Sequence, residues 1–297
     1  MALACADLHL RDVVPVCRTE TDIGFQFHQI RKLKRLFEQA RLWDVPVLIA
    51  GDTFDHWKPS HKLVAEVIET SKGARVIAVP GQHDLYAHDV CSLPKTGLGV
   101  LRASDWVILT KGESFILPSS KIKITGYAFG EEPGNSKDTD ILLWHMMTFV
   151  GKPPYPECPD SPAPRLAKRF PNVKLMITGD NHQPFYFNQT DQSRILNCGS
   201  MMRMTADQMD YKPMFYAIHD NLNCTPIPFP IERNVVSNVH LVREQEHDAK
   251  LEAFISRITK DSETSLSFEA NMDRFLEIDK TPAPVRQAVM MAMEKEN

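Results

Sequence analysis

Five short apolar runs, each followed closely by Asp or His, form the most regular pattern along this chain. The runs cover residues 2–6, 45–50, 76–79, 141–144 and 174–178. Apolar runs of this length, bounded by glycine, proline or charged residues, are typical of buried strands. The first three runs are separated by segments with helical periodicity. This alternation of strand and helix predicts an α/β fold.

Residues 22–43 are predicted to form an amphipathic helix with Asp22 as its N-cap, and Ser60 is the expected cap of a second helix over 62–71. The apolar face of the first helix is expected to contain Ile23, Phe27, Ile30, Leu33, Phe37 and Ala40. Two groups of basic residues are candidate surfaces for nucleic acid, or else ordinary solvated helix faces: Arg31, Lys32, Lys34 and Arg35, and Arg165, Lys168, Arg169 and Lys174.

The pattern changes after residue 100. Shorter strands are expected at 106–109, 121–127, 194–198 and 214–218, and six prolines within 151–164 indicate an extended loop. That loop is either a spacer or the rim of a substrate groove. Prolines 226, 228 and 230 mark a linker, followed by an expected strand at 235–242 and helices at 248–258 and 285–294. We therefore predict a main domain over 1–230 and a small α/β region over 231–297.

The candidate chemistry lies directly after the five apolar runs. The motifs are Asp7-Leu8-His9, Gly51-Asp52-Thr53-Phe54-Asp55, Gly81-Gln82-His83-Asp84, His145 and Gly179-Asp180-Asn181-His182. Loops at strand ends meet at one edge of an α/β domain, where ligands bind. Carboxylates combined with imidazoles, and little cysteine, suit Mn, Fe or Zn rather than Ca or an iron–sulfur cluster.

Composition limits the cellular setting and the partners. The formal net charge of −4 gives no overall positive field, so contact with nucleic acid would need a local patch and the metals. The six cysteines form no CxxC pair, no apolar run is long enough to cross a membrane, and the chain begins too close to its first motif for a signal peptide. These features predict a reduced cytoplasmic protein without structural disulfides.

The order of the motifs resembles the calcineurin-like metallophosphoesterases over roughly residues 5–215. Within that superfamily the chain is most similar to SbcD-type nuclease subunits, particularly the compact versions of bacteriophages. The narrower similarity lies in the segments 7–12, 51–55, 80–84 and 199–203, the last of which reads Gly-Ser-Met-Met-Arg. The resemblance implies a two-sheet αββα sandwich with a small C-terminal capping region.

The resemblance also implies two divalent metals bridged by Asp52. The first metal would take Asp7, His9, Asp52 and His182, and the second Asp52, Gln82, His145 and Asp180. Gln82 stands where the family commonly has Asn, and Asp180 stands where it has His. Both changes favour oxygen-preferring metals, so Mn²⁺ is expected before Fe, Mg or Zn. The same two changes could weaken the second metal site, so a protein with one strong metal site is the alternative.

His83 is the expected catalytic imidazole, which stabilises the charge on phosphate or protonates the leaving oxygen. Asp84 is expected to orient that imidazole and keep it protonated. Asp55 is a further catalytic candidate and His56 a candidate for phosphate contact; one of the two would contact substrate phosphate or orient a ligand, with a structural role behind the ligands as the alternative. Three arginines are candidates for phosphate contact, with salt bridges as the alternative: Arg11, Arg18 and Arg203.

The function expected from this resemblance is metal-dependent hydrolysis of DNA phosphodiesters, by an exonuclease or endonuclease subunit. Its expected partner is an SbcC-type coiled-coil ATPase, with a homodimer also implied, in the cytoplasm of a bacterial or phage-infected cell. Two alternatives stay open. The chain is a small-molecule phosphodiesterase or protein phosphatase of the same superfamily, or it is a binding subunit with a degenerate metal site.

Overall fold

The computed structural model describes residues 1–134, 139–159, 161–190, 193–261 and 268–294. The chain divides into two compact units, Met1–Ser237 and Asn238–Asn297. The first unit contains all the candidate site residues.

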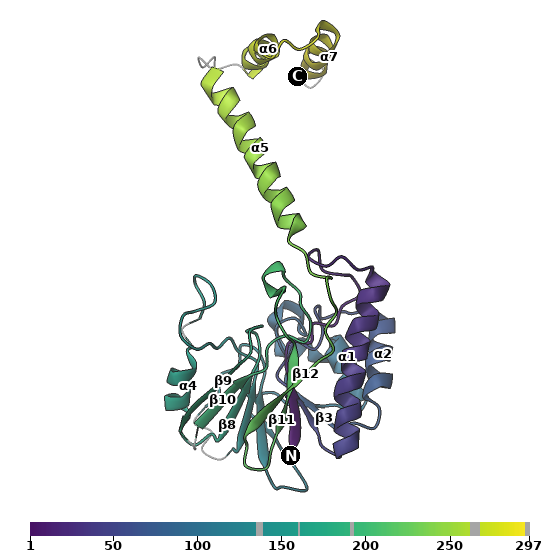
Figure 1. The fold of residues 1–297 in the computed structure, drawn as a ribbon, viewed down its shortest axis with the longest axis vertical. Helices are drawn as coiled ribbons and strands as arrows, with labels where there is room; N and C mark the ends of the chain where they lie inside the picture. Colours follow the sequence, from purple (N-terminus) through teal and green to yellow (C-terminus); the bar gives the residue numbers. More distant parts are fainter. Residues whose placement is uncertain (135–138, 160, 191–192, 262–267, 295–297) are drawn as a thin grey trace. The chain divides into compact units, whose positions relative to one another are not determined.

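Two six-stranded sheets form the centre of the first unit (Figure 1). The first has the order β12-β11-β1-β2-β3-β4, in which β1 to β4 are parallel and β11 and β12 are antiparallel at one edge. Its strands are β1 (Ala2–Cys5), β2 (Val47–Ile49), β3 (Val76–Ala78), β4 (Val107–Ile108), β11 (Met214–Ile218) and β12 (Cys224–Pro228).

The second sheet has the order β5-β6-β7-β8-β10-β9, with four parallel central strands and an antiparallel strand at each edge. Its strands are β5 (Glu113–Ile116), β6 (Lys123–Tyr127), β7 (Ile141–Trp144), β8 (Leu175–Thr178), β9 (Phe185–Thr190) and β10 (Ser193–Asn197). All five apolar runs of the sequence lie in the parallel parts of the two sheets.

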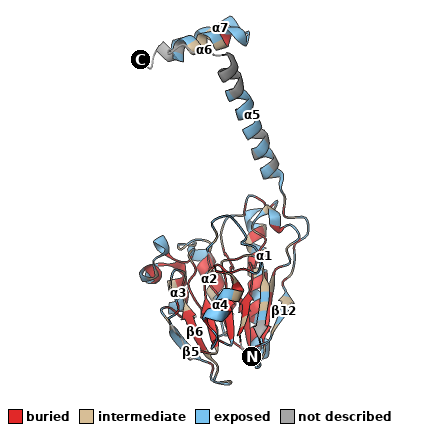
Figure 2. Ribbon diagram, turned by 90° about the vertical axis from the view of Figure 1, so that its left-hand side faces the viewer, coloured by how far each residue is buried: buried red, intermediate tan, exposed pale blue. Residues whose placement is uncertain are grey.

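Helices cover the outer face of each sheet, which gives four layers. Helices α1 (Asp22–Trp43), α2 (His61–Ser71) and α3 (Gly97–Ala103) pack on the first sheet, and α4 (Ala163–Arg169) packs on the second. Alternation along β1 assigns the layers: Leu3 and Cys5 face the helices, whereas Ala2 and Ala4 face the other sheet. Strands β1, β2, β3, β7 and β8 are buried on both faces, whereas the edge strands β5 and β12 are largely exposed (Figure 2). The predicted αββα sandwich is confirmed.

Helix α1 has the predicted bounds but a different cap and a different buried face. Thr21 is the N-cap, because its hydroxyl accepts the N–H of Gly24. Ile23 and Phe27 are 80% and 63% exposed. Gln29 is buried instead because its amide pairs with both backbone groups of Arg11, at 3.0 and 2.8 Å. The apolar periodicity of the helix does not predict burial of Gln29, because that burial depends on hydrogen bonds to Arg11, which lies outside the helix.

Lys32 is also buried, which removes it from the proposed basic surface of α1. Its Nζ lies 3.4 Å from a carboxylate oxygen of Glu232 and donates to the carbonyl of Met201 at 3.2 Å. Arg31 pairs with the same Glu232 at 3.1 Å. These two cations therefore hold the segment after β12 on the helix rather than forming an open surface for nucleic acid.

The second unit differs from the α/β region expected there. Its described part contains only helices: α5 (Val239–Asp261), α6 (Phe268–Ile278) and α7 (Ala283–Glu294). The expected strand at 235–242 is wrong, because α5 begins inside it. Residues 231–237 belong to the first unit, where the N–H of Ser237 donates to the carbonyl of Cys17 at 2.7 Å. No described helix is both long enough and apolar enough to cross a membrane.

Gly126, the fourth of the five residues of β6, provides a test of how closely the two sheets pack. A Cβ atom at this position would lie 2.3 Å from Cβ of Leu109 and 2.9 Å from Cγ1 of Val79. We expect Gly126→Ala to lower the free energy of unfolding by about 1–3 kcal/mol, because the sheets would have to separate locally. Urea denaturation measures this change.

The matched control is Gly134→Ala, since no atom lies within 4 Å of a Cβ built there. It should change stability by less than about 0.5 kcal/mol. Equal losses in the two variants would contradict close packing at Gly126.

Candidate metal centre

The candidate ligands converge at one edge of the sandwich. They lie in the loops that follow the carboxyl ends of β1, β2, β3, β7 and β8, in both sheets. Three groups of acidic and histidine side chains place their ligand atoms within 4.8 Å of one another: Asp7 with His9 and His182, Asp7 with Asp52 and His145, and His9 with Asp55 and His83. Residues more than 170 positions apart thus meet in a single cluster.

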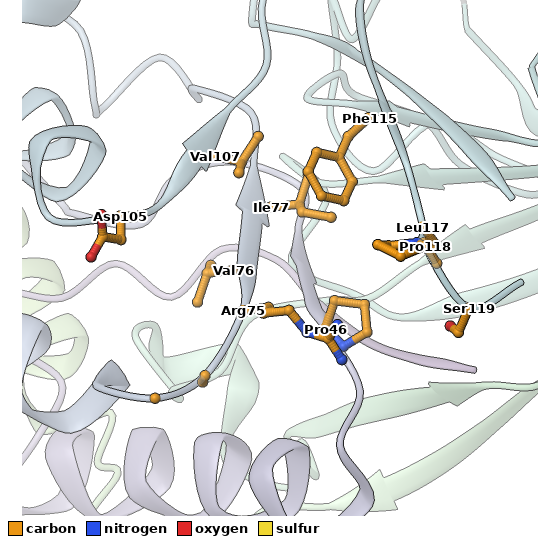
Figure 3. Close-up of a pocket in the computed structure, with 12 residues that line it drawn as sticks. Pro46, Arg75, Val76, Ile77, Asp105, Val107, Phe115, Leu117, Pro118 and Ser119 are labelled. Carbon is orange, nitrogen blue, oxygen red and sulfur yellow. The ribbon is translucent and has the colours of Figure 1, made fainter. Parts of the chain in front are cut away.

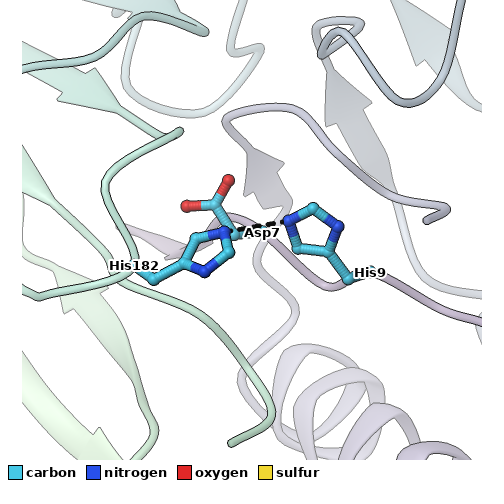
Figure 4. Close-up of side chains that lie close together, drawn as sticks. All are labelled: Asp7, His9 and His182. Carbon is cyan, nitrogen blue, oxygen red and sulfur yellow. Dashed lines mark hydrogen bonds between the residues drawn. The ribbon is translucent and has the colours of Figure 1, made fainter. Parts of the chain in front are cut away.

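Asp7, His9 and His182 form the first group (Figure 4). The Nε2 atoms of His9 and His182 face each other at 3.0 Å. Asp7 is fully buried; one carboxylate oxygen accepts the N–H of Asp180 at 2.9 Å, and the other has no hydrogen-bond partner among the described residues. Two imidazole nitrogens and an unpaired carboxylate oxygen are a suitable donor set for a divalent cation.

Asp52 lies between the first group and the second. Its Oδ2 is 3.6 Å from Nε2 of His9 and 3.5 Å from Nε2 of His145, and Oδ2 accepts no hydrogen bond from the described residues. Its Oδ1 accepts the N–H of His83 at 2.9 Å. One buried carboxylate oxygen therefore faces imidazoles from both sheets, which is the arrangement that a bridging ligand requires.

The second ligand group is the set expected around the second metal besides Asp52, and it consists of His145, Gln82 and Asp180. Nδ1 of His145 lies 2.6 Å from the carbonyl oxygen of Ala50, so this nitrogen carries the proton of the ring. The other nitrogen, Nε2, faces Oε1 of Gln82 at 2.7 Å as well as Asp52. The amide nitrogen of Gln82 donates to Asp180 at 2.7 Å. Nε2 of His145, Oε1 of Gln82 and Oδ2 of Asp52 thus lie close together as hydrogen-bond acceptors. Such an arrangement is stable only with a cation among them, either a proton or a metal ion.

The electrostatics of the cluster agree with this donor set. Burial lowers the pKa of His145, but the charge of Asp52 outweighs burial and raises that pKa to about 10. Burial raises the pKa of Asp7 to about 7. Burial and the charge of His9 lower the pKa of His182 to about 4. Without a metal, the cluster retains protons near neutral pH that a divalent cation would replace.

The backbone of these loops is strained where the ligands lie. Asp7, His9 and Asp52 have left-handed backbones, with φ of 48°, 42° and 48°. Residues other than glycine seldom adopt this region, and such strain is concentrated at functional sites. Gly81 allows its loop to approach Asp52, because a Cβ atom there would lie 2.1 Å from Oδ1 of Asp52.

His83 lies at the exposed side of the cluster, and its Nδ1 is 2.9 Å from the carbonyl oxygen of Asp55. Asp84 has a different position from the one expected. Its buried carboxylate accepts the N–H groups of Thr53, Phe54 and Gly81 at 2.9–3.1 Å. Asp84 therefore ties the second and third ligand loops together, and the Asp55 carbonyl is the group that orients the His83 ring.

Asp55 and Arg11 lie beside the first group. The Asp55 carboxylate is 3.3 Å from Nδ1 of His9 and 3.3 Å from Nη1 of Arg11. Burial opposes ionisation of Asp55, but the nearby His9 imidazole and the charge of Arg11 hold its pKa below the usual range. Both side chains are partly exposed. His56 is exposed, and its ring accepts the N–H of Lys58 at 3.1 Å.

Arg18 and Arg203 are not placed to bind phosphate as expected. The guanidinium of Arg18 is buried, pairs with Glu20 at 2.5 Å and donates to the carbonyl of Arg203 at 3.2 Å. Arg203 is also buried and donates to the carbonyls of Glu232 and Met209. A phosphate would have to displace these partners, so the salt-bridge alternative describes Arg18, while Arg203 is held by backbone carbonyls.

Two asparagines support the loop after β8, and motif spacing gave them no such role. Asn197 donates to the carbonyls of Asn181 and Gln183 at 2.6 and 2.8 Å, and Asn181 donates to the carbonyl of Thr148 at 2.8 Å. Both side chains are buried. Asn197 is the last residue of β10 and Asn181 lies three residues beyond β8, and this position near strand ends was the available signal, since a polar residue there can satisfy buried backbone groups.

A separate cavity of about 340 Å³ lies at the opposite ends of the strands (Figure 3). Its lining includes Pro46, which precedes β2, Arg75, which precedes β3, and Asp105, which precedes β4. None of the candidate ligands lines it, so this cavity is not part of the metal centre.

Comparison with known proteins agrees with the geometry. A model of the calcineurin-like phosphoesterase family matches residues 2–184. Similar solved structures include the protein TT1561 of Thermus thermophilus, which is 10% identical, with 76% of this chain and 97% of that chain covered and a TM-score of 0.46. No curated protein matches the chain.

Two further solved structures are a dimetal phosphatase from Danio rerio and the calcineurin-like phosphoesterase YfkN from Bacillus subtilis. The first is 12% identical, with 77% of this chain and 98% of that chain covered and a TM-score of 0.45; the second is 13% identical, with 85% and 97% covered and a TM-score of 0.41. The family match spans more than half of the chain and contains every candidate metal ligand from Asp7 to His182. The chain therefore belongs to the calcineurin-like phosphoesterase family.

Proposed function

We propose that this protein is a phosphodiesterase that depends on two divalent metals and acts on DNA. One observation supports the dinuclear site above the others. The unpaired Oδ2 of Asp52 lies 3.6 and 3.5 Å from the imidazoles of His9 and His145, at the junction of the two ligand groups. A bridging carboxylate is the common feature of two-metal hydrolases.

The residues that would hold the first cation are Asp7, His9, Asp52 and His182, and those for the second are Asp52, Gln82, His145 and Asp180. When bound, the cations would supply charge for the phosphate oxygens and activate a water molecule. Four of the seven side chains offer oxygen, which supports Mn²⁺ ahead of Fe, Mg or Zn. Gln82 reaches His145 at 2.7 Å, so its extra methylene does not take the amide away from the second group.

His83 is the residue we assign to the leaving oxygen. Its Nδ1 is held by the carbonyl of Asp55, so Nε2 is the atom that can carry a proton toward substrate. Its exposure leaves room for a phosphodiester. Arg11, held by Asp55 at 3.3 Å and partly exposed, can contact a non-bridging phosphate oxygen.

The choice of DNA as substrate is supported by the similarity of the motifs to SbcD-type nuclease subunits. That similarity also supports an SbcC-type ATPase as partner. In α5 three apolar residues at helical spacing are exposed, Leu251 at 49%, Phe254 at 49% and Ile255 at 54%. Such a stripe suits a coiled-coil partner, or a second copy of this chain. All six cysteines are free, which fits the reducing cytoplasm of a bacterial or phage-infected cell.

A small-molecule phosphodiesterase or protein phosphatase is the second candidate function, favoured by the net charge of −4. A binding subunit with a degenerate site is the third. The substrate that is hydrolysed and the number of bound metals distinguish these functions from DNA hydrolysis. Hydrolysis of an aryl phosphodiester or a phosphopeptide, with DNA left intact, would select the second, and fewer than two metals per chain without hydrolysis would select the third.

Asp52→Asn should abolish both metal bridging and hydrolysis, because an amide is a poor bridge between two cations. We expect the rate of DNA degradation in Mn²⁺ to fall at least about 100-fold. Metal content by mass spectrometry should fall with it. The control is Asp220→Asn, at a carboxylate that is 82% exposed. Full activity in Asp52→Asn would contradict the dinuclear assignment.

Metal affinity should rise with pH. Asp7, with its pKa raised by burial to about 7, is protonated below that pH and must lose the proton to bind a cation. Affinity for Mn²⁺ should therefore increase between about pH 6 and about pH 8, by up to about tenfold per pH unit for each displaced proton. Calorimetry in buffers of different ionisation enthalpy would count the released protons. Binding that releases none would contradict these proton positions.

His83→Gln should slow DNA cleavage by about 10²–10⁴-fold, because the departing sugar oxygen would lose its proton donor. Hydrolysis of a p-nitrophenyl phosphodiester should fall much less, since that leaving group needs no proton. His61→Gln, at the exposed first residue of α2, is the control. Equal losses on the two substrates would rule out proton donation by His83.

A further inference from the structure

A cavity of about 330 Å³ lies directly beside the second ligand group. His145 and Asp180 belong both to that group and to the lining of the cavity. An occupant would therefore be a neighbour of the scissile phosphate. The volume is at the small end of the roughly 300–1,000 Å³ range of ligand pockets, so it suits one ring system rather than a longer segment of substrate.

The walls of the cavity are largely apolar and aromatic. They include Phe129, Trp144, Met146 and, from α4, Leu166. The Phe129 ring lies 6.3 Å from the His145 ring, so an aromatic surface begins immediately next to the metal ligand. Flat apolar walls of this kind accept planar groups, and nucleobases stack on them without regard to sequence.

Two polar atoms in the lining residues distinguish a nucleobase from a plain aryl group. The indole N–H of Trp144 and Oε1 of Glu131 have no hydrogen-bond partner among the described residues. An unpaired buried donor or acceptor is destabilising, so a ligand that pairs with both atoms gains binding affinity. A nucleobase edge offers a donor and an acceptor together, whereas a phenyl or alkyl group offers neither. Both atoms are buried, and both residues belong to the lining of the cavity.

Charge in the lining is consistent with a neutral occupant. Glu132 is paired with Arg169 at 2.7 Å, and the other oxygen of Glu131 accepts the N–H groups of Lys111 and Ala128. Pro159 and Ser161 complete the wall on the side of the proline-rich loop. This places part of that loop at a rim, one of the two roles that its composition predicted.

We infer that this cavity is a subsite for the nucleobase of the nucleotide that flanks the scissile phosphate on the His145 side. This inference rests on the proposed phosphodiesterase function and extends it. The metal centre would hydrolyse any phosphodiester, and the cavity would raise kcat/KM for nucleotide esters above that for simple esters.

The test compares three chromogenic substrates that lose the same p-nitrophenolate: methyl p-nitrophenyl phosphate and the 3′- and 5′-p-nitrophenyl phosphates of thymidine. The Mn²⁺-loaded full chain should prefer one thymidine isomer, by about tenfold or more in kcat/KM, as expected for one stacked base. Leu166→Phe, which fills the cavity, should reduce that ratio, mainly through KM. Trp144→Phe, which keeps a ring and removes the N–H, should also reduce it.

Trp43→Phe, at the exposed end of α1, is the control and should leave the ratio unchanged. Free thymidine should inhibit the methyl ester competitively in the unaltered protein, a measurement that does not depend on the folding of any variant. Hydrolysis of all three esters at similar kcat/KM, without inhibition by thymidine, would overturn the subsite and leave the phosphodiesterase function intact. Failure to hydrolyse any ester would instead overturn the proposed function.

Discussion

The contact on which this site depends is that of one buried carboxylate with imidazoles from both sheets. Asp52 follows β2 of the first sheet, His145 follows β7 of the second, and a single oxygen of Asp52 lies within 3.6 Å of both His145 and His9. A carboxylate with no exposed surface is stable only if cations or donors surround it. Burial would raise the pKa of Asp52, but the charge of His145, followed by that of His9, holds that pKa well below its usual range.

The small residues between the sheets make this contact available. Ala2, Ala4 and Ala50 lie on the inter-sheet face, and Gly126 leaves no room for even one methyl group. Larger side chains here would move β7 away from β2 and separate His145 from Asp52. The same closeness recurs in the loops, where a Cβ at Gly51 would lie 2.1 Å from Nδ1 of His145. The close packing of the two sheets is therefore also what keeps the metal ligands of both sheets within reach of one another.

Hydrogen bonds to backbone N–H and carbonyl groups fix the ligand loops relative to one another. The carboxylate of Asp84 accepts three N–H groups from two loops, and the carbonyl of Ala50 holds His145. The carbonyl of Asp7 accepts the N–H of Met201 at 3.1 Å, and the carbonyl of Met201 accepts from buried Lys32. Helix α1 is thereby connected to the first ligand. Preorganisation of this kind holds ligands in strained backbone conformations that an isolated loop would not keep.

The sequence by itself determined the sandwich fold and the set of residues that meet at its edge. Buried strands read directly as apolar runs, and ligand motifs follow them because the carboxyl ends of parallel strands share an edge. Only the tertiary structure decided what depends on partners distant in sequence. It showed that Gln29 and Lys32 are buried while Ile23 is exposed, that Arg18 and Arg203 bind carbonyls, and that Asp84 holds loops rather than His83. It also replaced the expected strand near residue 240 with a helix, because local apolar pattern alone does not distinguish a short strand from the first turns of a helix.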